Sequence, residues 1–285
     1  MEEKGKKGRM DYTLLLIVVL LVVIGLVILY STSAYNGQVK FHDSFYYLKK
    51  QAFATVLGIV LMLFVAGMDY HIWQRLAVFG YLAAVALSVA VMLFGREING
   101  SKRWLALGPF SFQPSEFAKV ALILFLADLV TKNVKTIGKM WTLCRIMFWI
   151  LPIVGLVGAS NLSTAIIILG IGVILIFVAS PKYAQFALMG IAGACFMGIF
   201  LALESYRLER LAIWRNPEKY EKGYQTLQGL YAIGSGGVFG VGIGNSVQKL
   251  GFVPEAQNDM IFSIICEELG LAGAGIIGFL FLLLI

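Results

Sequence analysis

Eight long apolar runs constrain this chain more than any other feature, because each is close to the roughly 20 residues that a helix needs to cross a bilayer. The runs cover approximately residues 12–31, 51–68, 75–95, 115–130, 143–159, 162–180, 184–203 and 260–285. Of the 285 residues, 59% are hydrophobic and only 14% are charged, which excludes an ordinary soluble domain. The sequence therefore predicts an all-α, polytopic membrane helix bundle.

The basic charge of the chain does not indicate a nucleic-acid partner. The net charge is +7, but much of it lies in loops between apolar runs, where membrane orientation and anionic lipids explain it. The three cysteines lie in or beside apolar runs without CxxC spacing, and the two histidines have no neighbours in metal-ligand spacing. We therefore expect no disulfide framework and no zinc site.

The distribution of Lys and Arg near the ends of the apolar runs predicts the orientation. These residues are more numerous on the side that carries the N-terminus, which favours a cytoplasmic N-terminus. Residues 204–259 then form a large extracytoplasmic loop, and residues 99–104 lie on the same outer side. The chain ends within the apolar stretch FLFLLLI, so we expect further C-terminal spans to be missing.

The first polar cluster lies just before the fourth apolar run. Lys102 and Arg103 stand beside Trp104, a combination that is typical of snorkelling cations and an aromatic side chain at a membrane interface. Arginine also binds phosphate in a bidentate manner, so the same residues could form a phosphate clamp at the outer surface. The sequence leaves both interpretations open.

The fourth apolar run begins with Gln113 and Pro114, and proline suits the first turn of a helix. Glu116 and Lys119 are three residues apart, so they share one helix face and can pair. Such a pair could be purely structural, or it could face a polar cavity and contact a substrate. Both roles are compatible with each other.

The long loop carries a charged half and a glycine-rich half. Its charges from Glu204 to Lys222 are typical of an amphipathic interfacial segment, from which we single out Arg210. The glycines of residues 234–244 could present backbone N–H groups to an anion, or could form a flexible re-entrant loop. The stretch lacks the GK[ST] ending of a nucleotide-binding loop.

The loop ends in the sequence PEAQND, residues 254–259, directly before the last apolar run. Acidic residues at a membrane boundary are costly and commonly mark a functional site, which nominates Asp259. The alternative is that Asn258 or Asp259 caps the helix that follows. Glu267 and Glu268 lie deeper in the run, where we expect at least one to pair within the bundle.

These motifs resemble the SEDS family (shape, elongation, division and sporulation), which includes FtsW, RodA and SpoVE. The resemblance covers essentially the whole chain, and its specific parts are NGSKRW at 99–104, QPSEFAK at 113–119, and the segment from Gly223 to Gly270. The sequence GNSVQK at 244–249 is similar to the FtsW and SpoVE branch. The family usually has ten spans, so the resemblance implies a single SEDS-type domain over 1–285 that lacks about two spans.

The resemblance implies a peptidoglycan glycosyltransferase that polymerises lipid II at the outer face of the cell membrane, during division or sporulation and with the division septum as its expected location. Asp259 matches the essential aspartate of the family and would be the catalytic base. The implied partners are a class B penicillin-binding protein and other divisome proteins, with no nucleic acid. A divalent cation could assist the pyrophosphate, although the ligands of a metal stay unknown. The residues expected to contact substrate are Lys102, Arg103, Trp104, Gln113, Glu116, Lys119, Arg210, Lys249 and Glu255.

The chain departs from the family pattern at two places. Gln257-Asn258 stand where the family often has His-Thr, and residues 160–164 read SNLST where the family often has Pro-Asp-Leu-Gly-Thr. The second change removes an acidic residue, which puts in doubt any role of that loop.

Two other functions remain open. A lipid II flippase would use the same cations while the lipid crosses the bilayer, and a scaffold would only dock a divisome partner. A flippase needs polar residues through the depth of the membrane, and the first, third and seventh apolar runs carry few charges, which favours the polymerase.

Overall fold

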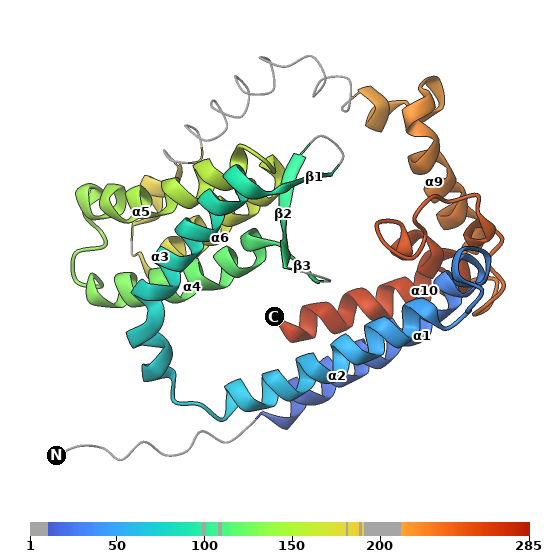
Figure 1. The fold of residues 1–285 in the computed structure, drawn as a ribbon, viewed down its shortest axis with the longest axis horizontal. Helices are drawn as coiled ribbons and strands as arrows, with labels where there is room; N and C mark the ends of the chain where they lie inside the picture. Colours follow the sequence, from blue (N-terminus) through green and yellow to red (C-terminus); the bar gives the residue numbers. More distant parts are fainter. Residues whose placement is uncertain (1–10, 99–100, 108–109, 181, 188–189, 191–211) are drawn as a thin grey trace. The chain divides into compact units, whose positions relative to one another are not determined.

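The computed structural model describes residues 11–98, 101–107, 110–180, 182–187, 190 and 212–285 (Figure 1). The chain forms two compact units, of which the first comprises Met1–Gly67 with Phe200–Ile285 and the second comprises Met68–Ile199. Six of the described helices are long and apolar enough to cross a membrane, with mean hydropathies between 1.7 and 3.3. The predicted class, a polytopic helical membrane protein, is confirmed.

Within its described residues the first unit is built mainly from four helices: α1 (Tyr12–Phe41), α2 (Tyr46–Ala66), α9 (Tyr224–Gly236) and α10 (Ile261–Leu284). Figure 1 shows α1, α2 and α10 running side by side, and α9 packs against α10. Three single-turn 3₁₀ helices, Pro217–Lys219, Glu221–Gly223 and Gln248–Leu250, shape the connecting segments.

Helix α1 has a clear start and a clear stop. The Asp11 side chain accepts hydrogen bonds from the backbone N–H groups of Thr13 and Leu14, at 2.9 and 3.1 Å, as an N-cap residue does. At the other end His42 adopts a left-handed conformation with φ of 55°, which ends the helix. The helix continues ten residues beyond the predicted apolar boundary at residue 31, and this polar extension contributes to the site described below.

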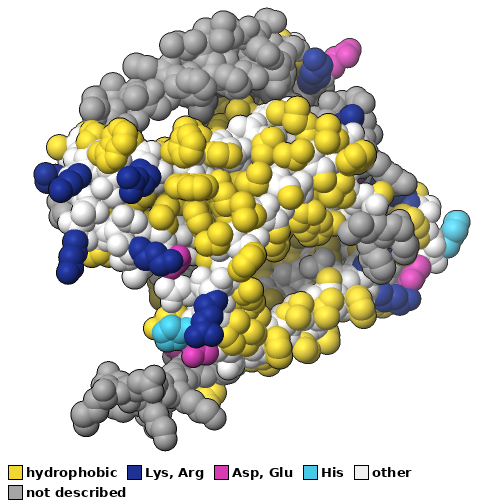
Figure 2. Space-filling model, turned by 60° about the vertical axis from the view of Figure 1, so that its left-hand side comes forward, with side chains coloured by type: hydrophobic (Ala, Val, Ile, Leu, Met, Phe, Trp, Pro, Cys, Tyr) yellow, Lys and Arg dark blue, Asp and Glu magenta, His cyan; other side chains and the backbone are white. Residues whose placement is uncertain are grey.

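Helix α2 buries none of its residues within the protein. Its large apolar side chains, such as Phe53 and Phe64, are mostly exposed. Figure 2 shows hydrophobic side chains covering much of the visible surface, with charged side chains mostly toward its margins. Such a surface matches a hydrocarbon environment and not water.

The second unit contains α3 (Tyr70–Phe94), α4 (Pro114–Lys132), α5 (Met140–Gly158) and α6 (Leu162–Ala179) among its described residues. Helix α3 packs against α4 and α5, and α6 packs against α4 and α5. Tyr81 lies in the core that results, stacked on Phe125 with ring centroids 4.4 Å apart. Its hydroxyl donates a 2.8 Å hydrogen bond to the backbone carbonyl of Trp149, so its polar atom is satisfied.

Helix α4 begins at Pro114, as predicted, with the proline in its first turn. The helix is not among the six candidate spans, and it carries four charged residues: Glu116, Lys119, Asp128 and Lys132. Asp128 is buried, and its carboxylate accepts hydrogen bonds from Gln74 and from Lys132, at 2.9 and 2.6 Å. The charge on this buried side chain is therefore compensated within the helix.

The connection between α3 and α4 contains three short strands that the sequence did not predict. These are β1 (Arg96–Ile98), β2 (Ser101–Leu107) and β3 (Phe110–Phe112), and they pair antiparallel in the order β1-β2-β3. The register places Arg96 opposite Trp104 and Leu105 opposite Phe112. The predicted polar cluster at 102–104 is therefore held on a strand.

The seventh predicted span, residues 184–203, lies almost entirely outside the described residues. The other seven each coincide with a helix, although several boundaries differ by a few residues.

Candidate functional site

The PEAQND sequence forms a compact turn directly before α10. Glu255 adopts a positive φ of 51°, which is uncommon for a residue with a side chain. Its carboxylate accepts hydrogen bonds from the amide groups of Asn258 and Gln257, at 2.6 and 3.3 Å. Glu255 was predicted to contact substrate; in the structure it fastens the turn that carries Asp259.

Asp259 is exposed, and its carboxylate has neither a hydrogen-bond partner nor an ion-pair partner among the described residues. The N-cap position of α10 is occupied by Met260 and has no side-chain cap. The helix-capping interpretation of Asn258 and Asp259 is therefore wrong. A carboxylate that stabilises nothing else in the described structure is free to act on a ligand.

The turn is also anchored to α1. Gln257 is buried, and its side-chain oxygen accepts a 2.9 Å hydrogen bond from the Asn36 amide. Asn36 belongs to the part of α1 that extends beyond the predicted apolar boundary. The polar extension of α1 therefore fixes the turn, which explains why the helix does not end where its apolar run does.

A buried ion pair lies between α1, α10 and the 3₁₀ turn at Gln248–Leu250. Lys249 donates to the Glu268 carboxylate at 2.6 Å, and the two side chains are 7% and 0% exposed. The Ser31 hydroxyl lies 2.7 and 2.8 Å from the two oxygens of the same carboxylate, and 3.0 Å from the Lys249 ammonium. Lys249 was predicted to contact substrate, but in the structure its charge is used within the protein.

The neighbouring Glu267 is also buried and satisfied. Its carboxylate accepts a 2.5 Å hydrogen bond from the Ser246 hydroxyl and a 3.1 Å bond from the backbone N–H of Val247. The expectation that at least one of the two deep glutamates pairs within the bundle is confirmed. Both of them tie α10 to the segment that precedes the PEAQND turn.

The glycine-rich segment fills a break in α10. Gly270 has a positive φ of 69°, which kinks the helix, and a side chain there would collide with the backbone of residues 238–240. The kink removes helical hydrogen bonds, and residues 237–242 replace them. The replacing bonds are Val241 N–H to Glu267 O, Gly242 N–H to Glu268 O, Leu271 N–H to Gly237 O and Ala272 N–H to Val238 O, at 2.9–3.0 Å. The N–H groups of Val241 and Gly242 are therefore not available to an anion.

The NGSKRW cluster lies in the second unit. Lys102 and Arg103 are exposed, and Trp104 is half-buried. The Arg103 Nε atom donates a 3.2 Å hydrogen bond to the carbonyl oxygen of Ser160, in the turn between α5 and α6. Only one edge of the guanidinium is used in this bond, so a face of Arg103 remains for an anion.

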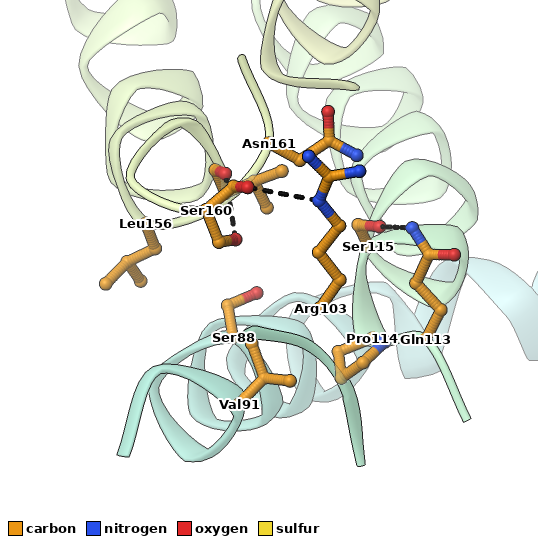
Figure 3. Close-up of a pocket in the computed structure, with 10 residues that line it drawn as sticks. Ser88, Val91, Arg103, Gln113, Pro114, Ser115, Leu156, Ser160 and Asn161 are labelled. Atoms are coloured by element: carbon orange, nitrogen blue, oxygen red, sulfur yellow. Dashed lines mark hydrogen bonds between the residues drawn. The ribbon is translucent and has the colours of Figure 1, made fainter. Parts of the chain in front are cut away.

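Figure 3 shows the small polar cavity beside Arg103. The Ser88, Ser115 and Ser160 side chains line it, and Gln113 donates to the Ser115 hydroxyl at 3.0 Å. The cavity measures about 10 Å³, which is room for a single water molecule and not for a sugar. Gln113 therefore orders the entry of α4 in this structure.

Glu116 and Lys119 pair as predicted, with 2.8 Å between the carboxylate and the ammonium. The Glu116 side chain is 58% exposed and that of Lys119 is 26% exposed. Because both side chains are at least partly exposed, they remain accessible to a ligand. Such a pair stabilises a helix by less than about 1 kcal/mol.

Arg210, which was predicted to bind substrate, lies outside the described residues. Among the residues that are described, no group of three or more His, Cys, Asp or Glu side chains is placed to hold a metal ion. The divalent cation therefore stays a prediction, for which the described residues offer no set of ligands.

Sequence reasoning missed the uncharged partners of the site. Ser31, Asn36 and Ser246 satisfy buried polar groups that lie farther along the sequence, and the first two lie on α1. A signal was present, because the polar run Ser31-Thr32-Ser33 interrupts a strongly apolar helix. Such a run needs a polar partner when it is buried.

Comparison with known proteins gives a consistent result. The family described as cell cycle proteins, which takes in FtsW, RodA and SpoVE, matches residues 12–285. Stage V sporulation protein E of Bacillus subtilis is 37% identical over 98% of this chain and 78% of its own length. A probable peptidoglycan glycosyltransferase FtsW of Saccharophagus degradans is 33% identical over 95% of this chain and 73% of its own length.

Two solved structures are also similar. One is a chain from a peptidoglycan synthase complex that coordinates polymerization and crosslinking. Its TM-score is 0.74 and its sequence identity is 28%, and the match covers 97% of this chain and 76% of that one. The rod shape determining protein RodA of Thermus thermophilus has a TM-score of 0.65 and 26% identity, covering 97% and 73%.

Proposed function

Because the chain belongs to the FtsW, RodA and SpoVE family, it is a peptidoglycan glycosyltransferase of cell division or sporulation, and we propose that Asp259 is its catalytic base. The observation that carries this proposal is the exposed Asp259 carboxylate, which lacks partners in the described structure while the rest of its turn is fastened. Glu255 and Gln257 hold the turn, so the position of Asp259 is defined without using its charge.

The substrate that we propose is lipid II, a disaccharide-pentapeptide on undecaprenyl pyrophosphate. A hydroxyl of the acceptor sugar attacks the anomeric carbon of the donor, and the bond between that carbon and the pyrophosphate oxygen breaks. Asp259 takes the proton of the attacking hydroxyl. The electron pair leaves with the lipid pyrophosphate, which departs readily once its charge is neutralised, so no second carboxylate has to protonate it.

Cations are needed to neutralise the leaving pyrophosphate. Lys102 and Arg103 are exposed on their strand, and arginine suits the bidentate binding of phosphate oxygens. We keep these two residues as proposed phosphate ligands, together with Trp104, Gln113, Glu116 and Lys119 as proposed substrate contacts. Lys249 is less suited to this role, because its ammonium is buried against Glu268.

A polymerisation assay tests the function directly. The full-length protein, purified with a class B penicillin-binding protein, should convert lipid II into glycan chains that are resolved by gel electrophoresis. A parallel assay in liposomes measures the movement of lipid II between leaflets. Movement without polymerisation would support the flippase, and the absence of both would support the scaffold.

The partner and the location are also proposals. The similar chain of known structure belongs to a complex that couples polymerization to crosslinking, which supports a crosslinking transpeptidase as the partner of this chain. The protein crosses the membrane several times. We place its N-terminus in the cytoplasm and the protein at the division septum together with other divisome components.

The orientation predicts which introduced cysteines a membrane-impermeant thiol reagent will label. In a variant that lacks Cys144, Cys195 and Cys266, a cysteine at the exposed Lys219 should be labelled in cells whose outer barrier has been opened. A cysteine at Lys135 should react only after the membrane is permeabilised. The reverse pattern would place Asp259 in the cytoplasm and would contradict polymerisation at the outer surface.

A further inference from the structure

An open groove of about 430 Å³ lies in the first unit, between α1, α2 and the turn that precedes α10. This volume is within the range of sites that bind small molecules. The wall contributed by α1 is apolar, with Val22, Gly25, Leu26 and Leu29 recurring at the spacing of one helix face. Because α1 is strongly apolar, this wall suits a hydrocarbon chain.

The opposite wall is polar. Helix α2 contributes Tyr47, Lys50, Gln51 and Thr55, and the turn contributes Gln257 and Asn258. Lys50 is the only charged side chain among the described residues that line the groove. Its ammonium donates to the Tyr46 hydroxyl at 2.6 Å and lies 4.3 Å from the centre of that ring. No carboxylate among the described residues forms an ion pair with it.

We propose that this groove binds the lipid-linked sugar of the reaction by the junction of its chain and phosphate. The hydrocarbon chain lies on the apolar face of α1, and Lys50 binds the phosphate that is attached to this chain. This assignment rests on the proposed function. It adds a location in the first unit for the lipid part of the substrate.

Two features favour a sugar lipid over an ordinary phospholipid. Asn258 lines the groove and is exposed, and its side-chain oxygen accepts no hydrogen bond from the described residues, so a sugar hydroxyl can bind it. Asn258 also directly precedes Asp259 in the chain. A ligand whose headgroup contacts Asn258 therefore has its first sugar beside the residue that performs the chemistry.

Gly25 offers a way to fill the groove without disturbing the fold. A Cβ atom added at Gly25 meets no heavy atom within 4 Å, and the same is true at Gly58 of α2, which does not line the groove. Gly25→Phe should weaken binding of lipid II about tenfold or more, because a phenyl ring occupies the space of the chain. Gly58→Phe is the matched control, and its affinity should equal that of the unmodified protein.

Neighbouring lysines supply a second pair of variants. Lys50→Gln should weaken binding of lipid II about three- to tenfold by removing the cation that faces the groove. Lys49→Gln is its control, since Lys49 pairs with Asp43 at 2.7 Å, has a 69% exposed side chain and does not line the groove.

The full-length protein is titrated in detergent with lipid II and, separately, with phosphatidylglycerol, and bound lipid is counted by native mass spectrometry. Selective loss of lipid II binding in Gly25→Phe and Lys50→Gln supports the proposal. Loss of phosphatidylglycerol binding alone, or no loss in either variant, overturns it. If Gly25→Phe does not fold, Lys50→Gln decides: unchanged lipid II binding overturns the proposal. The titration needs no turnover, so its failure differs from failure of the polymerase function.

Discussion

Asp259→Asn is expected to lower the rate of glycan polymerisation about 10²- to 10⁴-fold, which is the usual contribution of a general base. The amide keeps the size of the side chain but cannot take the proton of the attacking hydroxyl. Stability should not change, because the Asp259 carboxylate has no partner among the described residues and caps no helix. The rate is measured with purified protein and lipid II.

The matched control for this substitution is Glu218→Gln, which neutralises another exposed acid that precedes α9. This variant should polymerise at the normal rate. A normal rate for Asp259→Asn would remove Asp259 from the mechanism. A loss of folded protein in Asp259→Asn would instead reveal a structural role for the carboxylate.

Lys249→Met is expected to destabilise the protein by about 3–5 kcal/mol, because it leaves the Glu268 carboxylate buried without its cation. The double variant Lys249→Met/Glu268→Leu should recover much of this loss, since it removes both charges from the interior. The midpoint of thermal unfolding in detergent reports the difference. Lys219→Met, at an exposed lysine, is the control and should leave the midpoint unchanged.

The same variants separate a structural lysine from a substrate ligand. If the double variant folds and polymerises lipid II, Lys249 acts only through its pair with Glu268. If Lys249→Met is as stable as the unmodified protein but inactive, the lysine is used on the substrate and the structural interpretation fails.

Much of the fold could be predicted because membrane spans depend on composition over short windows. The start of α4 at Pro114 followed from local backbone chemistry, and the pairing of Glu116 with Lys119 followed from helical spacing. Each of these features is decided by residues within one or two turns of helix. Such local rules do not require knowledge of the tertiary structure.

The features that were missed depend on partners distant in the sequence. Helix α1 continues to Phe41, and its residues Ser31 and Asn36 form side-chain hydrogen bonds with Glu268 and Gln257, which lie more than 200 positions away in the sequence. The three strands before α4 are short, and among the described residues they pair with one another. Strands this short show no long alternating pattern of apolar and polar residues from which they could be predicted.

The sequence singled out residues of the candidate site, but it could not give the structural role of each residue. Asp259 and the deep glutamates were singled out because charge near a membrane is costly. Spacing alone could not show whether Asp259 caps α10 or has a free carboxylate. It also could not show that Lys249 forms a buried ion pair with Glu268. The sequence left open whether the glycine-rich stretch binds an anion or forms a flexible loop; in the structure two of its N–H groups complete a broken helix.

The broken helix also has a consequence for how the protein is made. Residues 237–242 leave the ribosome before residues 267–272, with which they exchange backbone hydrogen bonds in the finished protein. A newly inserted α10 that lacks this partner must keep its own bonds, because an unsatisfied backbone group in lipid costs several kcal/mol. The completion of α10 therefore depends on the earlier-made residues 237–242, which supply the backbone partners that the break at Gly270 removes.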